Sequence, residues 1–237
     1  MFVSRISTGS KELDYWLGGG YERDVITTIY GPAGSGKTNL CLLAAATQAS
    51  FGKKVIYIDT EGGFSAERLK QIASREVMKN IFLLRATKFS EQHEAFNKLL
   101  ELINRKVGLI VVDSISMLYR LELSIANQER DFEKVQTINR ALARQLRILA
   151  EIARKKYIPV LVTNQVYSEF LSKEDFEAGK EKSVSMVGGD LLKYWSKCII
   201  ELQNLEGKKR AILRKHRSLP EKEFFFKIVE KGIKKAD

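Results

Sequence analysis

The chain has 237 residues, 44% of them hydrophobic and 29% charged, which is the balance of a globular protein long enough to bury a core. No apolar run reaches the length of a membrane span and the first residues lack the apolar stretch of a secretory signal, so we expect a cytoplasmic protein with no membrane partner. The formal net charge of +11 favours a polyanionic partner, nucleic acid first, although a basic surface that is merely solvated would give the same balance.

Short apolar runs alternate with amphipathic segments as far as about residue 189. Runs rich in Val and Ile are typical of strands buried on both faces of a parallel sheet, and we predict them at Val25–Tyr30, Val55–Ile58, Ile81–Leu84, Val107–Val112 and Ile158–Val162. The clearest helix runs from about Glu129 to Lys156, because apolar residues recur there every three or four positions from Phe132 to Ile152. This alternation predicts a parallel sheet with right-handed crossovers and helices on its faces.

The pattern changes after Gly189. Three strands with short turns follow one another, at Cys198–Leu202, Arg210–Lys215 and Phe224–Val229. We expect them to extend the sheet as an antiparallel edge. Because we find no repeat and no low-complexity linker, we expect residues 1–237 to form a single α/β domain.

A phosphate-binding motif follows the first predicted strand. The pattern G-x-x-x-x-G-K-[ST] is complete in Gly31-Pro32-Ala33-Gly34-Ser35-Gly36-Lys37-Thr38, and a helix-forming segment begins at Asn39. The glycines let backbone N–H groups turn towards a β-phosphate, Lys37 can reach the β- and γ-phosphates, and the Thr38 hydroxyl can ligate Mg²⁺. A flexible Gly-rich turn is the alternative, but the strand before and the helix after it favour a site for ATP with Mg²⁺, with Asn39 included.

Two further strands deliver acidic residues to their C-terminal ends. The run Leu109–Val112 ends in Asp113, a Walker-B pattern that would position Mg²⁺ through water; the alternative is an N-cap for the next segment, helped by Ser114. After Tyr57–Ile58, Glu61 is a candidate general base and Asp59 a lesser one. The alternative for Glu61 is a solvated acid in a loop.

These elements resemble the RecA superfamily and, more narrowly, the archaeal and eukaryotic RecA-like recombinases. Besides the P-loop, the matching segments are Arg5-Ile6-Ser7-Thr8-Gly9, Leu13-Asp14, Leu17-Gly18-Gly19-Gly20, Tyr57–Gly62, Leu109–Ser114, Thr163-Asn164-Gln165-Val166 and Gly188-Gly189. Their order and spacing hold over nearly the whole chain, which implies a RecA-like P-loop NTPase core. Almost nothing precedes Arg5 and no Phe-x-x-Ala anchor is present, so we expect a short archaeal paralogue without the N-terminal helical domain of the full-length recombinases.

The resemblance implies functional roles for the residues of this chain that match the family's motifs. It implies that Lys37 and Thr38 bind nucleotide, that Asp113 is the Walker-B acid, that Glu61 activates water, and that Gln165 senses the γ-phosphate and relays it to DNA-binding loops. It further implies an ATP-binding, DNA-binding accessory protein of homologous recombination and DNA repair, a weak ATPase without autonomous strand exchange. Expected partners are single-stranded or branched DNA, recombination proteins such as the main recombinase, and further copies of the chain in a homo-oligomer.

In recombinases the loops after Gln165 contact single-stranded DNA. Between Val166 and Val187 this chain has five acids against three bases, a net charge of −2 that disfavours phosphate binding. Tyr167 and Phe170 in that segment either stack on bases or pack against the domain. The better electrostatic candidate for a DNA surface is the basic group formed by Lys208, Lys209, Arg210 and Arg214.

The stretch Lys215-His216-Arg217 resembles a motif of KaiC-like ATPases, in which a Lys and an Arg reach the nucleotide of a neighbouring subunit. Strand alternation puts Lys215 and Arg217 on the core side of their strand, an odd place for solvated charges, and favours a phosphate partner. The hypothesis is a finger acting across an interface; the alternative is a DNA-facing or solvated basic patch. Rival functions are a KaiC-like regulatory ATPase without a DNA role and an interaction module that binds ATP without turnover.

Overall fold

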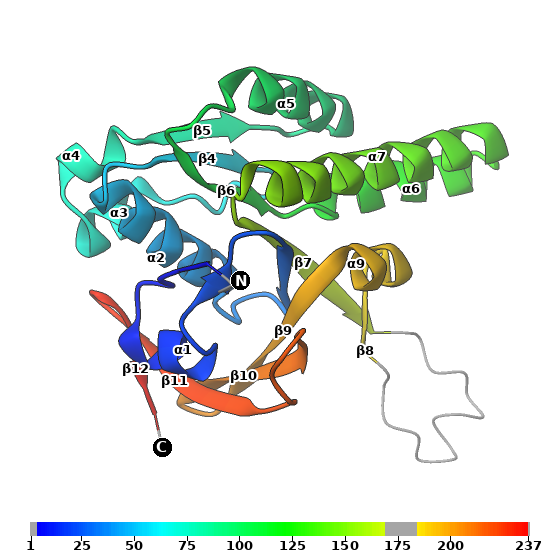
Figure 1. The fold of residues 1–237 in the computed structure, drawn as a ribbon. Coiled ribbons are helices and arrows are strands. Elements are labelled where there is room, and N and C mark those ends of the chain that lie inside the picture. Colours follow the sequence, from blue (N-terminus) through cyan, green and yellow to red (C-terminus); the bar gives the residue numbers. More distant parts are fainter. Residues whose placement is uncertain (1–3, 169–183, 237) are drawn as a thin grey trace, which may run out of the picture.

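The structure, a computed structural model, describes residues 4–168 and 184–236. Ten strands of this part form one sheet in the order β12-β11-β10-β9-β3-β7-β6-β4-β5, with β8 paired to β7 (Figure 1). Their bounds are β3 (Ile26–Gly31), β4 (Lys54–Asp59), β5 (Ile81–Arg85), β6 (Val107–Asp113), β7 (Val160–Ser168), β8 (Val184–Met186), β9 (Ser196–Leu205), β10 (Lys208–Lys215), β11 (Glu223–Val229) and β12 (Gly232–Lys235). A small ribbon pairs β1 (Arg5–Ile6) with β2 (Tyr21–Glu22). The mixed α/β fold with a mostly parallel central sheet is confirmed.

The antiparallel edge begins one strand later than expected. β9, which contains the predicted strand Cys198–Leu202, runs parallel to β3 and is antiparallel only to β10. The reason is the helix α9 (Gly189–Trp195), which carries the chain back before β9 starts, as a parallel neighbour requires. β10, β11 and β12 then follow as antiparallel hairpins.

Helices cover both faces of the sheet because alternate residues of its central strands are apolar on each side. Val55 and Tyr57 of β4 join the core on one face, while Ile56 and Ile58 join the core on the other. The first face carries α1 (Lys11–Trp16), α2 (Lys37–Ser50), α3 (Ala66–Ile72) and α4 (Arg75–Met78). The second carries α5 (Phe89–Leu102), α6 (Met117–Gln128), α7 (Phe132–Lys156) and α9. Full burial on both sides explains the near-continuous apolar runs.

The long helix α7 starts three residues after the predicted Glu129. Asp131 is its N-cap and accepts a hydrogen bond from the Lys134 amide at 2.9 Å, and Arg130 before it has a left-handed φ of 55°. Phe132, included in the apolar stripe, is 79% exposed at the first turn, whereas Leu142 and Leu146 are fully buried. Periodicity therefore predicted the buried face correctly and the first turn wrongly.

The C-terminal ends of β3, β4, β6 and β7 lie at the same edge of the sheet, since these strands are parallel. Ligands of open α/β sheets bind at that edge. The candidate DNA loop after Gln165, with Phe170, lies largely in 169–183, outside the described residues. In the described ranges, no helix is both long and apolar enough to cross a membrane.

Candidate active site

The P-loop connects β3 to α2 and folds tightly against β9. A Cβ on Gly31 would lie 2.3 Å from the carbonyl oxygen of Leu202, so only glycine fits there. Gly36, at the entry to α2, has a φ of 102°, which favours glycine for the same turn. The Lys37 ammonium folds back into the loop and donates hydrogen bonds to the carbonyls of Gly31 and Pro32, each at 2.9 Å.

The outer side of the loop is held by the β9–β10 hairpin. Asn204 donates from Nδ2 to the carbonyl of Ala33 at 3.1 Å, and Lys209 donates from Nζ to the carbonyl of Gly34 at 2.6 Å. Lys209 also donates to Asn204 Oδ1 at 2.9 Å. Because C=O and the following N–H point in opposite directions in a trans peptide, carbonyls held outward turn the next amides inward. Lys209, expected in a DNA patch, therefore lies at the P-loop.

The residues of the loop fit a phosphate group. The Ser35 hydroxyl is buried and has no hydrogen-bond partner in the described part of the chain. Burial lowers the pKa of Lys37, and the negative charges of Glu61 and Asp113 act in the opposite direction. A phosphate would supply both an acceptor for Ser35 and a counter-charge for Lys37.

Asp113 ends β6 and is 1% exposed. Its carboxylate accepts hydrogen bonds from the Tyr57 hydroxyl, at 2.8 Å, and from the Thr163 hydroxyl. Burial, with the charge of Asp113, raises the pKa of Tyr57, so that hydroxyl stays protonated as a donor. Asp113 is not an N-cap: α6 starts at Met117 with Ser116 as its N-cap. The carboxylate oxygens retain lone pairs for a water bound to Mg²⁺, and Thr38 at the start of α2 offers a hydroxyl.

The loop after β4 contains the candidate general bases. Gln165 donates from Nε2 to Glu61 Oε2 at 3.0 Å, which joins two predicted residues 104 positions apart. Asp59, the lesser candidate, is 2% exposed and accepts from the amides of Gly63 and Phe64 at 3.1 and 3.2 Å. Asp59 therefore shapes the loop, and these contacts favour Glu61 over Asp59 as the general base. Glu61 is exposed at the open side of the site.

The side chain of Asn39 is bound by an arginine of α3. Its Oδ1 accepts from Arg68 Nε at 2.8 Å, and the same guanidinium donates to the carbonyls of Val229, Glu230 and Gly232 in the β11–β12 turn. Arg68 on α3 thus fastens the C-terminal hairpin to the start of α2. Sequence reasoning missed Arg68, because its partners come from distant segments and no local pattern marks them.

Much of the positive charge of the basic group predicted as a DNA surface is neutralised by acidic and polar residues nearby. Arg214 forms ion pairs with Glu201 and Glu221, each at 2.6 Å, and Arg210 contacts Gln203 and Glu223. Lys208 Nζ lies 4.7 Å from the Phe225 ring centroid. These acids are distant in sequence from the basic residues, so the sequence did not predict the pairs. Antiparallel strand pairing brings the two sets together. Of the group Lys208, Lys209, Arg210 and Arg214, the two arginines are thus paired with acids and Lys209 contacts the P-loop, and its role as a DNA surface stays a prediction.

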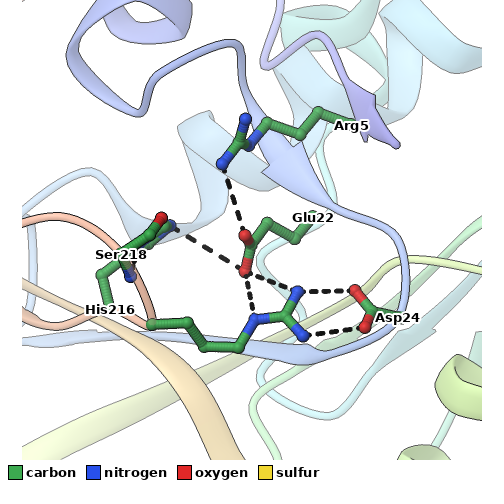
Figure 2. A network of polar contacts seen from close by, with 6 residues as sticks. Arg5, Glu22, Asp24, His216 and Ser218 are labelled. Atoms are coloured by element: carbon green, nitrogen blue, oxygen red, sulfur yellow. Dashed lines mark hydrogen bonds and ion pairs between the residues drawn. The ribbon is translucent and has the colours of Figure 1, made fainter. Parts of the chain in front are cut away.

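The contacts of Lys215 and Arg217 also differ from the phosphate contacts that we expected. A β-bulge between Leu213 and Lys215 breaks the alternation on which it rested. Lys215 donates to the Lys193 carbonyl at 2.5 Å. Arg217 donates to both carboxylate oxygens of Asp24, at 2.7 and 2.8 Å, and to Glu22 at 3.1 Å, within the network in Figure 2. These partners from its own chain remove the reason for assigning a phosphate to Arg217.

Comparisons with known proteins agree with this geometry. The family model Rad51 matches residues 2–236. "DNA repair and recombination protein RadB" of Methanocaldococcus jannaschii is 43% identical over 222 residues, which cover 92% of this chain and 97% of that protein. The RadB protein of Methanobrevibacter smithii is 44% identical over 231 residues, covering 93% of this chain and 92% of that one. A solved structure, "Crystal structure of the RadB recombinase", superimposes with a TM-score of 0.77 at 36% identity and covers 98% of this chain and 100% of its own.

Proposed function

This chain belongs to the Rad51 family, and we propose that it is an ATP-binding and DNA-binding accessory protein of homologous recombination and DNA repair. The printed names of its RadB relatives support the role in repair and recombination. The observation that carries the nucleotide part is the pairing of Gln165 with Glu61 at 3.0 Å, beside Lys37, Thr38 and Asp113 at one edge of the sheet. Family members bind ATP with Mg²⁺, which fits these residues.

Nucleotide binding uses the contacts that the P-loop already makes. Lys37 exchanges the carbonyls of Gly31 and Pro32 for the β- and γ-phosphates, and the Ser35 hydroxyl gains an acceptor. Thr38 would ligate Mg²⁺ through its hydroxyl and Asp113 would hold the hydrated ion through its carboxylate, because small hard cations prefer oxygen ligands and keep their waters. When bound, Mg²⁺ offsets the negative charge that develops on the transferred phosphoryl group.

Hydrolysis, which we propose to be slow, depends on Glu61. Its carboxylate orients a water for in-line attack and accepts a proton from it. Gln165 holds Glu61 in place and offers its amide to the γ-phosphate, so the same amide reports whether ATP is bound. Because Gln165 lies on β7, which continues to Ser168, binding of ATP would be passed along this strand to the segment that follows. ATP then acts as a conformational switch more than as an energy source.

The test is Glu61→Gln, which keeps the size of the side chain and removes its charge as a base. We expect ATP binding in calorimetry to stay within a few-fold of wild type, while phosphate release falls by roughly 10²- to 10⁴-fold, the usual contribution of a general base. Glu67→Gln is the matched control, because Glu67 is 80% exposed on α3, where it pairs with Lys70 at 2.5 Å. Failure of the wild-type protein to bind Mg-ATP would overturn the nucleotide assignment itself.

DNA binding is tested separately with a labelled single strand, in fluorescence anisotropy across a salt series, with and without Mg-ATP. We expect affinity to fall steeply with salt, because phosphate contacts release counterions. We expect it to respond to ATP through Gln165. No binding at low salt would remove the DNA part of the proposal. A recombinase partner and a homo-oligomer are further parts of this proposal, tested by native mass with and without nucleotide.

The two rival functions are less well supported. The KaiC-like reading rested on Lys215 and Arg217, but Arg217 is paired with Asp24 and Glu22 of its own chain. The family and relatives reported above give that reading no support. An interaction module that binds ATP without turnover differs from our proposal only in the phosphate-release assay, where a flat baseline with intact ATP binding would favour it.

A further inference from the structure

Four arginines lie on the exposed side of α7. Arg140, Arg144, Arg147 and Arg154 are separated by four, three and seven residues, spacings that keep them on one face of a helix. All four are exposed, and they extend over about 21 Å of the helix at 1.5 Å per residue. The buried residues of α7, among them Leu142 and Leu146, take the opposite face. The helix thus presents a row of guanidinium groups to solvent.

The charges of this row are less fully paired than those of Arg210, Arg214 and Arg217, although Arg147 interacts electrostatically with Glu151 and Arg154 with Asp24. Arg144, Arg147 and Arg154 form no ion pair within the described ranges, whereas Arg210, Arg214 and Arg217 each bind carboxylates. Two acids lie on this side of α7: Glu151, which is paired with Lys155 at 2.6 Å, and Glu133 in the first turn, seven residues before Arg140. Basic residues in the last turn of a helix offset its macrodipole, but this explains only Arg154 and its neighbours. Arg144 and Arg147 lie in mid-helix, where the dipole gives no such benefit.

Aromatic side chains border this row where α9 packs on α7. A hollow of about 520 Å³ is lined by Arg147, Arg154, Lys155 and Trp195, among others. Tyr194 is 69% exposed, and its ring is perpendicular to that of Trp195 with the centroids 5.2 Å apart. Arginines beside accessible aromatic faces are the combination with which proteins hold a nucleic-acid backbone and stack its unpaired bases.

Three lysines extend the positive charge beyond α9. Lys193 and Lys197 are exposed, and the carbonyl of Lys193 accepts a hydrogen bond from Lys215. Lys197 Nζ lies 5.7 Å from the Tyr194 ring centroid. Partial burial lowers the pKa of Lys215, and the positive charge of Lys197 lowers it further. Cations crowded in this way gain from an anionic ligand, because it removes their mutual repulsion.

This region is separate from the nucleotide site. Ser196, which follows α9, pairs with Ile26 at the first residue of β3, whereas the P-loop begins at Gly31 at the other end of that strand. Figure 1 shows α9 beside α7 and away from the loop between β3 and α2. A ligand here would leave the P-loop and the Glu61–Gln165 pair accessible.

We infer that the α7–α9 surface, formed by Arg144, Arg147, Arg154, Lys193, Tyr194, Trp195, Lys197 and Lys215, binds single-stranded DNA. The arginines bind phosphates through bidentate hydrogen bonds, and Tyr194 and Trp195 stack on bases. A single strand fits better than a duplex, because only unpaired bases can present a face to these rings. This inference rests on the proposed DNA-binding function and assigns it a surface that differs from the segment after Gln165.

The experiment compares three forms of the full chain in anisotropy titrations of a labelled oligodeoxythymidylate at several salt concentrations. The variant R144A/R147A removes two mid-helix charges and keeps a strong helix former at both positions. The control K98A/R105A removes the same charge from exposed positions on and just after α5. For two lost phosphate contacts on a single strand, we expect the salt slope of log K to fall by about 1.4, while the control keeps the wild-type slope.

Tyr194→Ala tests stacking at a side chain that is 69% exposed, so folding should be unaffected. We expect about tenfold weaker binding at every salt concentration, with an unchanged slope, because stacking involves no counterion. Quenching of tryptophan fluorescence by the oligonucleotide should disappear in Trp195→Phe. If the wild type binds while R144A/R147A matches it in slope and affinity, the α7–α9 surface is refuted and DNA binding stands. If the wild type does not bind at low salt, both proposals fail together; a preference for duplex refutes the stacking role.

Discussion

Lys37 and Lys209 approach the P-loop from opposite sides with different tasks. Lys37 lies inside the loop on the carbonyls of Gly31 and Pro32, where a phosphate can replace them. Lys209 lies outside the loop and donates to the carbonyl of Gly34 and to Asn204. It can keep both hydrogen bonds when a phosphate binds. The motif predicted Lys37 because its position is fixed by local spacing. Lys209, 175 residues from Gly34, has no sequence signature for its contact.

Lys37→Ala removes the ammonium that meets the phosphates. A hydrogen bond to a charged group contributes about 1.5–3 kcal/mol, so we expect ATP affinity to fall by roughly 10- to 100-fold in calorimetry. The substitution also leaves the buried Gly31 carbonyl without its donor, so we expect a lower melting temperature in the absence of nucleotide as well. Unchanged ATP affinity would contradict the assignment of the P-loop.

At the scale of elements, the β9–β10 hairpin covers a loop that belongs to the other end of the chain. Gly36 packs against this part of the sheet: a Cβ there would lie 3.2 Å from Ile228 and 3.5 Å from the stem of Lys209. The hairpin therefore shapes the phosphate site without belonging to any nucleotide-binding motif. Arg68 makes a second connection, because its guanidinium on α3 donates hydrogen bonds to carbonyls of the β11–β12 turn.

Lys209→Met tests this support. The substitution keeps an unbranched stem against Gly36 and removes the donor to Gly34 and Asn204. For one partly exposed charged hydrogen bond we expect a loss of about 1 kcal/mol, hence roughly fivefold weaker ATP binding. Lys209→Arg should restore most of it. Lys231→Met, at an exposed position between β11 and β12, is the control and should bind ATP as wild type does. Equal ATP affinity in the two Met variants would refute the proposed contribution of Lys209 to the phosphate site.

At the scale of the whole molecule, a buried carboxylate connects the N-terminal β1–β2 ribbon to the segment that follows β10. Glu22 on β2 is 2% exposed and forms ion pairs with Arg5 on β1, at 3.4 Å, and with Arg217 beyond β10, at 3.1 Å (Figure 2). His216 lies 3.9 Å from it, with a side chain that is 1% exposed. The Ser218 amide donates to His216 Nδ1 at 3.2 Å, so this nitrogen carries no proton in the neutral ring.

Burial lowers the pKa of His216, and the charges of Arg5 and Arg217 lower it too, against the opposing effect of Glu22. A base with a lower pKa in the folded state binds fewer protons there than in the unfolded chain. The free energy of unfolding should therefore decrease as pH falls below about 6.5, the ordinary pKa of histidine, until the folded pKa is reached. His216→Gln should flatten this part of the pH profile in denaturant titrations. A profile that stays steep in His216→Gln would assign the pH dependence to other groups.

The sequence by itself determined the order of the strands along the chain, the buried face of α7 and the residues that end strands at the active edge. These features depend on local spacing: a strand buried on both faces has to be apolar throughout, and its first polar residue marks the edge where ligands bind. Asp113 and Glu61 were predicted in this way, Lys37 and Thr38 from the P-loop motif, and Gln165 from the resemblance to the recombinases. The structure brings Glu61 and Gln165 into contact.

The tertiary structure alone decided which charges are neutralised and which remain exposed. Lys209 lies on the P-loop, Arg214 and Arg217 are paired with acids, and Arg144 and Arg147 on α7 have no ion pair in the described residues. The physical reason is that an ion pair depends on the separation of two groups in space over a few ångströms. Strand pairing sets that separation between residues far apart in sequence, so runs of like charge could not show where a polyanion would bind.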